Sequence, residues 1–125
     1  MRKQLLLFLW IAGLCLLGLT GGEVLPAAGQ GILAAQVRAG EDTSWLDCFA
    51  DRAGEACARA ERSFVRTLDG GCSSPIAAFA VLEGETITLT GMGFGGEKST
   101  LTGPINQPEA LGRTLAERMR KEGLA

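Results

Sequence analysis

The end of a predicted helix and the start of a predicted strand lie within the stretch Arg59-Ala60-Glu61-Arg62-Ser63-Phe64-Val65-Arg66-Thr67-Leu68-Asp69-Gly70-Gly71-Cys72-Ser73-Ser74-Pro75-Ile76. Apolar residues recur at intervals of three and four through its first half, which predicts an amphipathic helix from about residue 52 to residue 68. Gly70-Gly71 is expected to end this helix as a glycine cap. The predicted apolar face consists of Ala53, Ala56, Cys57, Ala60, Phe64, Val65 and Leu68, and the predicted solvent-facing residues are Arg59, Glu61, Arg62 and Arg66.

Downstream of this stretch, the sequence predicts three strands and a terminal helix. Ile87 and Leu89 alternate with threonines, which is the period of a half-buried strand. The last segment carries leucine and methionine on one helical stripe. The predicted strands cover residues 76–82, 85–90 and 98–102, and the predicted helix covers residues 108–122.

Upstream, the pattern predicts a further helix and a further strand. Asp42 or Thr43 can cap a helix that runs to about residue 50, with Trp45, Leu46 and Phe49 on one face. Residues 32–37 read as a strand of a buried sheet. The fold class is therefore α+β: residues 41–125 are expected to be a domain with a small antiparallel three-stranded sheet covered by helices. Residues 1–40 have the pattern of the tail of another unit.

The glycine-rich run Gly91-Met92-Gly93-Phe94-Gly95-Gly96 satisfies the G-x-G-x-x-G pattern of dinucleotide-binding loops. That function requires the run to open a helix, whereas the residues that follow it have a strand pattern. The run is therefore predicted to be the loop of a β-hairpin.

Composition excludes several classes of function. The 125 residues have a net charge of −2 and no clustered Lys/Arg footprint, so we expect no nucleic-acid partner. No histidine is present, which removes Ser-His and Cys-His nucleophilic pairs and histidine-bearing zinc sites, and no metal is expected. The four cysteines, Cys15, Cys48, Cys57 and Cys72, form no C-x-x-C pair and are expected to be reduced thiols, with Cys48 and Cys57 in the core.

The N-terminus allows two interpretations. Arg2 and Lys3 precede an apolar run over residues 5–19, which is typical of a signal peptide or a short membrane anchor. The run is shorter than the roughly 20 residues that a spanning helix needs. The alternative is the buried helix end of a larger protein.

Cys72 is the residue whose position most favours a chemical reaction. It directly follows a Gly-Gly pair on a predicted loop, where the glycines let a ligand or another segment approach closely. As a thiolate, its sulfur is an effective nucleophile toward electrophilic carbon. A lone cysteine is, however, more often a packing residue than a reactive one.

Residues 60–76 resemble the porphobilinogen deaminase signature A-E-R-x-F-x-x-x-L-x-G-G-C-x-x-P-I, and they match it without a gap. Leu25-Pro26-Ala27-Ala28-Gly29-Gln30-Gly31-Ile32-Leu33 is similar to the L-P-A-x-G-Q-G-x-L stretch at the end of that family's second domain. This resemblance implies that residues 1–40 are the tail of that second domain, which is α/β. Residues 110–116 fit the family's last helix, and residues 11–19 resemble the segment that precedes the second stretch.

The resemblance implies a function and a covalent cofactor. Family members are transferases of heme and tetrapyrrole biosynthesis, hydroxymethylbilane synthases, which polymerise four porphobilinogen units with release of ammonia. The primer is a dipyrromethane cofactor, and Cys72 corresponds to the cysteine that holds it through a thioether. Gln30 and Gly31 correspond to a turn beside the cofactor cavity, although Gly29-Gln30-Gly31 also fits an ordinary tight turn.

The resemblance also limits what this chain is expected to do. The family's catalytic aspartate and most of its substrate-binding arginines lie in its first two domains, so no catalytic residue is assignable here. We expect a cytoplasmic C-terminal fragment that is inactive alone and whose partners are porphobilinogen and the missing N-terminal domains. Two alternatives are a membrane-anchored or secreted α+β binding module, with a membrane as partner only if the N-terminus is a true anchor, and an inert interaction domain.

Overall fold

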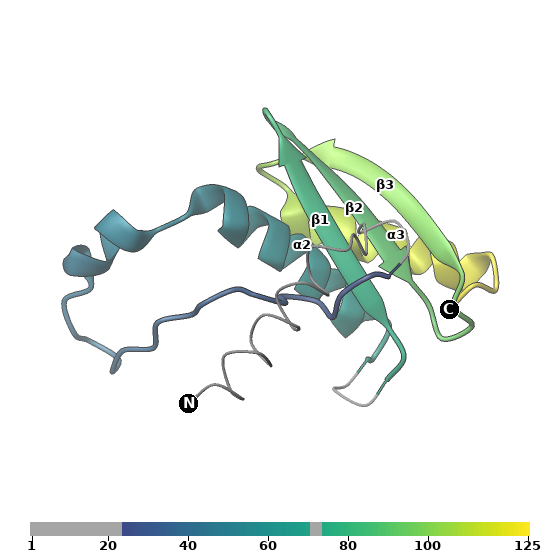
Figure 1. Ribbon diagram of the computed structural model, residues 1–125, viewed down its shortest axis with the longest axis horizontal. Helices are drawn as coiled ribbons and strands as arrows, with labels where there is room; N and C mark the ends of the chain where they lie inside the picture. Colours follow the sequence, from purple (N-terminus) through teal and green to yellow (C-terminus); the bar gives the residue numbers. More distant parts are fainter. Residues whose placement is uncertain (1–23, 71–73) are drawn as a thin grey trace, which may run out of the picture.

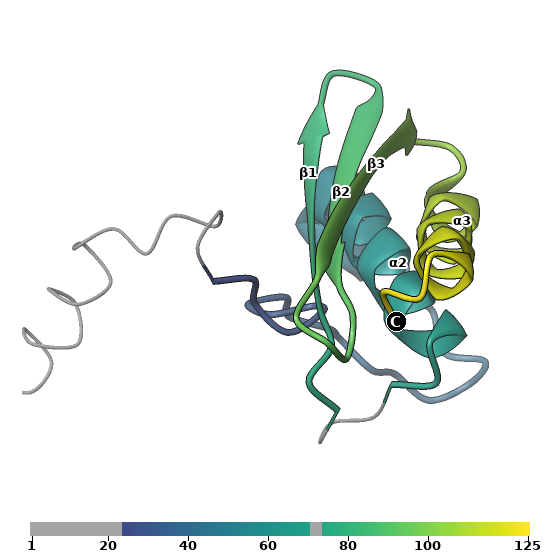
Figure 2. The same ribbon diagram turned by 90° about the vertical axis from the view of Figure 1, so that its right-hand side faces the viewer.

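Residues 52–125 form a three-stranded antiparallel sheet with two α-helices packed against one face (Figure 1). The structure is a computed structural model, and it describes residues 24–70 and 74–125. Figure 2 shows both α-helices on the same side of the sheet. In chain order the elements are a 3-10 helix η1 (Ser44–Phe49), α2 (Arg52–Thr67), β1 (Ala77–Glu83), β2 (Thr86–Met92), β3 (Lys98–Pro104) and α3 (Pro108–Lys121).

The sheet is a meander in the order β1-β2-β3, which confirms the predicted α+β class. Ala80 pairs with Leu89 and Leu89 pairs with Leu101, so the central strand β2 aligns apolar residues across the sheet. Ile87 and Leu89 are fully buried on the helix-covered face, while Thr88 and Thr90 point to the other face and are half-buried. The alternation in the sequence therefore marked which face of β2 meets the helices.

The core lies between the sheet and the two helices. Its largest fully buried side chains come from three elements: Phe64 from α2, Ile87 and Leu89 from β2, and Leu115 and Met119 from α3. The predicted hairpin loop is confirmed, because the amide of Gly93 donates to the Glu97 carbonyl oxygen over 3.1 Å between β2 and β3.

The end of α2 differs from the prediction. Asp69, and not a glycine, takes the left-handed conformation, with a φ of 57°. The amide of Asp69 donates to the Arg66 carbonyl oxygen and that of Gly70 donates to the Val65 carbonyl oxygen, the two hydrogen bonds of a Schellman motif. Gly70 instead leaves room for its neighbours: a Cβ there would lie 2.8 Å from the Ile76 Cδ1 atom, which would have to shift.

The predictions upstream of α2 are wrong in three respects. Residues 32–37 form no strand and are mostly exposed, since no described strand pairs with them. The predicted helix near residue 45 is a 3-10 helix without buried residues, in which Trp45 is 58% exposed. Cys48 lies in this helix and is exposed, so it is not a core residue.

Candidate functional site

The junction between α2 and β1 contains the predicted attachment residue. Cys72 lies outside the described residues, as do Cys15 and the apolar N-terminal run, so the structure leaves the predictions about them untested. Both flanks of the junction are described. Gly70 follows Asp69, the residue after the Leu68 C-cap of α2. On the other side, the carbonyl oxygen of Ser74 accepts the amide of Ile76 over 2.8 Å, just before β1.

Gln30 and Gly31 lie in a tight turn, as their sequence predicts. The amide of Gln30 donates to the Ala27 carbonyl oxygen over 3.0 Å, and the amide of Ile32 donates to the Gly29 carbonyl oxygen over 3.2 Å. Gly29 and Gly31 have φ values of 75° and 80°, which glycine adopts without strain. Gln30 and Gly31 are both exposed, and the space around Gly31 is open to 4 Å, so a ligand could approach the backbone here.

The turn is attached to the free edge of β1. The amide of Ala78 donates to the Pro26 carbonyl oxygen over 3.3 Å. Leu25 is buried and Ala28 packs against the core cluster. The segment that carries Gln30 therefore belongs to the same packed unit as α2 and the sheet.

Glu61 contradicts the prediction that it faces solvent. Its side chain is 5% exposed and it accepts two backbone hydrogen bonds. The amide of Gly29 donates to Oε2 over 2.7 Å, and the amide of Ala80 donates to Oε1 over 2.8 Å. A carboxylate between two amide donors is satisfied in a buried position, which an unpaired carboxylate would not be.

The sequence contained a signal for this burial. Glu61 follows Cys57 by four residues and precedes Phe64 by three, so helical spacing places it on the apolar face of α2. Its two donors lie 32 and 19 residues away along the chain, a pairing that no local pattern reveals.

The described thiols lack the features of a nucleophile. Cys57 is half-buried, and burial, followed by the nearby carboxylates of Glu61 and Asp51, raises the pKa of its thiol above the ordinary value. Cys57 is therefore protonated near neutral pH and largely unreactive. The Cys48 Sγ donates to the Trp45 carbonyl oxygen over 3.2 Å, and neither thiol is in a disulfide.

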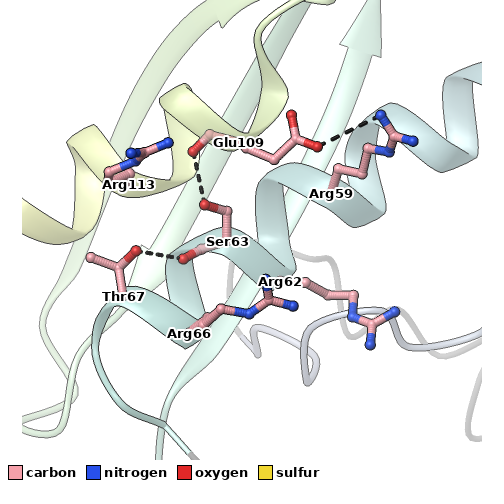
Figure 3. Close-up of a pocket in the computed structure, with 7 residues that line it drawn as sticks. All are labelled: Arg59, Arg62, Ser63, Arg66, Thr67, Glu109 and Arg113. Atoms are coloured by element: carbon pink, nitrogen blue, oxygen red, sulfur yellow. Dashed lines mark hydrogen bonds and ion pairs between the residues drawn. The ribbon is translucent and has the colours of Figure 1, made fainter.

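A shallow hollow of about 550 Å³ lies between α2 and α3 (Figure 3). Arg59 pairs with Glu55 over 2.6 Å and with Glu109 over 3.6 Å at its rim. The guanidinium groups of the arginines that line the hollow could hold an anion. The hollow is separate from the predicted cofactor contacts, because neither Gln30 nor Gly31 lines it. Its lining residues are Arg59, Arg62, Ser63, Arg66, Thr67, Glu109 and Arg113.

No group of three or more potential metal ligands occurs within residues 24–70 and 74–125. In the same part of the chain, no helix has the length and apolar character needed to cross a bilayer.

The described residues form a small α+β domain. The family model for "Porphobilinogen deaminase, C-terminal domain" matches residues 55–121, a range that contains the Gly70-Gly71-Cys72 segment. The chain belongs to the porphobilinogen deaminase family.

Curated relatives agree with this assignment. The chain is 45% identical over 104 residues to the porphobilinogen deaminase of Alkaliphilus oremlandii, covering 80% of this chain and 35% of that protein. It is 50% identical over 103 residues to that of Acetivibrio thermocellus, covering 79% of this chain and 35% of that protein. The chain thus spans about a third of the length of the curated relatives that it matches.

Proposed function

We propose that this chain is the cofactor-carrying part of a hydroxymethylbilane synthase, a transferase of heme and tetrapyrrole biosynthesis that acts on porphobilinogen. The observation that carries the proposal is the family match over residues 55–121, which includes Cys72 directly after the Gly-Gly pair. The free thiols of Cys48 and Cys57 agree with a cytoplasmic location, where thiols stay reduced.

Cys72 would hold the dipyrromethane through a thioether, and Gln30 and Gly31 would contact it. When bound, the dipyrromethane would serve as the primer to which four porphobilinogen units are added with release of ammonia. The side-chain amide of Gln30 is exposed and can both donate and accept hydrogen bonds, which suits a group with polar substituents. Gly31 has no side chain and open space around it, so it leaves room beside the turn.

We also propose that residues 1–40 are the tail of a second α/β domain and that residues 41–125 are the cofactor-attachment domain. Ile32 and Leu33 are 44% and 98% exposed, which is expected of apolar residues that other parts of the enzyme would cover. The exposed face of this segment would then pack against domains that hold the catalytic aspartate and the carboxylate-binding arginines.

Covalent loading of Cys72 tests the proposal. The full chain is co-produced with the N-terminal two-thirds of the Acetivibrio thermocellus relative, and peptides of the purified complex are weighed by mass spectrometry. We expect the Cys72 peptide to carry the added mass of a dipyrrole, and the complex to convert porphobilinogen to hydroxymethylbilane. Cys72→Ser should abolish both, whereas Cys48→Ser should preserve both.

The opposite result is equally clear. An unmodified Cys72 peptide in a stable complex would reject the role of this cysteine. Formation of hydroxymethylbilane by the isolated chain would reject the proposal that the remaining domains are needed.

A further inference from the structure

Glu61 is the only charged side chain that is buried among the described residues 24–70 and 74–125. It projects from the middle of α2 to the place where the Gly29 turn meets the edge of β1. Its two carboxylate oxygens accept one amide from each: Gly29 over 2.7 Å and Ala80 over 2.8 Å. The side chain thus joins three segments that are distant in sequence.

The same helix leads to the predicted attachment residue. From Glu61 to the Leu68 cap, α2 continues for seven residues, about 10 Å at 1.5 Å per residue. Cys72 follows four residues after that cap. The Glu61 hydrogen bonds therefore fix Gln30 and Gly31, which directly follow Gly29, relative to α2 and the edge of β1.

We propose that Glu61 is a positioning residue that holds the Gly29-Gln30-Gly31 turn in place against α2 and the edge of β1, and so sets where Gln30 and Gly31 can meet a bound ligand. The inference rests on the proposed function, because Gln30 and Gly31 matter for turnover only if they contact the cofactor. Apart from the Glu61 bridge, the described residues show one backbone hydrogen bond between the turn segment and β1, from the Ala78 amide to the Pro26 carbonyl oxygen over 3.3 Å. The Glu61 bonds are shorter and charge-assisted, and are therefore the stronger link.

The role requires a carboxylate. Glutamine has the same length but a single carbonyl oxygen, so its NH2 group would face one of the two amide donors. Methionine has a similar length and accepts neither bond. An exposed glutamate in the same helix offers a matched control: Glu55 has a side chain that is 57% exposed and pairs only with Arg59.

Amide hydrogen exchange of the full chain, measured by NMR, tests whether Glu61 holds the turn. In Glu61→Gln we expect the amide of Gly29 or Ala80 to exchange at least about tenfold faster, and in Glu61→Met both. The amides of Leu89 and Leu115 should keep their rates, and Glu55→Gln should change none of the four. Unchanged exchange at Gly29 and Ala80 would overturn the proposal. Equal acceleration of all amides would also overturn it, because Glu61 would then stabilise the whole domain.

A double-mutant cycle with Gln30→Ala tests whether the positioning acts on the site. In the co-produced complex we expect Glu61→Gln to lower kcat about tenfold when Gln30 is present and less than about threefold in the Gln30→Ala background. The same factor in both backgrounds would overturn the proposal. If the wild-type complex is inactive and Cys72 stays unmodified, the proposed function fails, while the exchange rates still decide whether Glu61 holds the turn.

Discussion

Asp69 carries backbone strain at the end of α2. Its φ of 57° lies in the left-handed region, which costs a residue with a Cβ roughly 1–2 kcal/mol. Its ion pair with Arg120 spans 3.8 Å and its side chain is 92% exposed, so solvent screens this pair almost completely. The residue therefore contributes through its conformation and not through its charge.

Replacement of Asp69 by glycine is expected to stabilise the domain. Glycine removes the left-handed strain and loses part of that gain through its larger unfolded-state entropy, so we expect the free energy of unfolding to rise by about 0.5–1 kcal/mol. Asp69→Val should lower it by about 1–2 kcal/mol. Urea unfolding of both variants provides the measurement, and a glycine variant less stable than wild type would contradict the strain.

The Cys57 thiol should make the stability fall at high pH. Because burial and the carboxylates of Glu61 and Asp51 raise its pKa above the ordinary 9.0, the folded chain keeps this proton to a higher pH than the unfolded chain. The stabilising contribution is complete below about pH 9 and is lost as the pH rises through the folded-state pKa. Urea unfolding gives the free energy of unfolding at pH 8 and at pH 10. The decrease between the two pH values should be smaller for Cys57→Ser than for wild type. An identical loss in both proteins would refute this assignment.

At the scale of elements, α2 and α3 pack through a glycine. A Cβ on Gly112 would lie 2.8 Å from the Phe64 backbone nitrogen and from the Ser63 Cβ, and would also contact the Ala60 carbonyl oxygen. Ser63 adds a hydrogen bond over 2.8 Å from its Oγ to the Glu109 carbonyl oxygen. The close approach of the two helices therefore depends on the missing side chain.

Gly112→Ala should destabilise the domain, although alanine is the better helix former by about 1 kcal/mol. Because the added methyl group meets backbone atoms that cannot move alone, we expect the free energy of unfolding to fall by about 1–3 kcal/mol. Gly95→Ala is the matched control: Gly95 has open space and no left-handed φ, so its change should stay within about 0.5 kcal/mol. Thermal unfolding of both variants provides the measurement. A Gly112→Ala variant as stable as the Gly95→Ala control would contradict the packing argument.

At the scale of the whole molecule, residues 32–50 stand apart from the packed unit. None of these residues is buried, and 3-10 helix η1 is the only regular element in the segment. The aromatic side chains of this segment, Trp45 and Phe49, are 58% and 77% exposed. In the proposed enzyme these apolar groups would be covered by other domains.

Limited digestion with chymotrypsin should therefore cut this segment first. We expect early cleavage after Leu33, Trp45 or Phe49, because unpaired and exposed backbone fits a protease cleft without unfolding. Phe79 is the internal control: it is 38% exposed but hydrogen-bonded within β1, and should resist cleavage. Mass spectrometry of the fragments identifies the sites, and early cleavage after Phe79 would show that the sheet opens more readily than the exposed segment.

The sequence by itself determined the periodic elements and the family. The intervals between apolar residues in α2 and the alternation in β2 are local, so they predicted both elements to within a few residues of their observed bounds. The contiguous match around Gly70-Gly71-Cys72 identified the family for the same reason, since it needs no knowledge of contacts.

Only the tertiary structure decided which residues are buried or hydrogen-bonded in the packed unit. Glu61 looked like a surface residue until the Gly29 and Ala80 amides were brought to it from 32 and 19 residues away. Residues 32–37 have the composition of a strand but no partner strand in the described chain. In both cases the outcome depends on hydrogen-bond partners from distant segments, and a local pattern contains no information on where those segments lie.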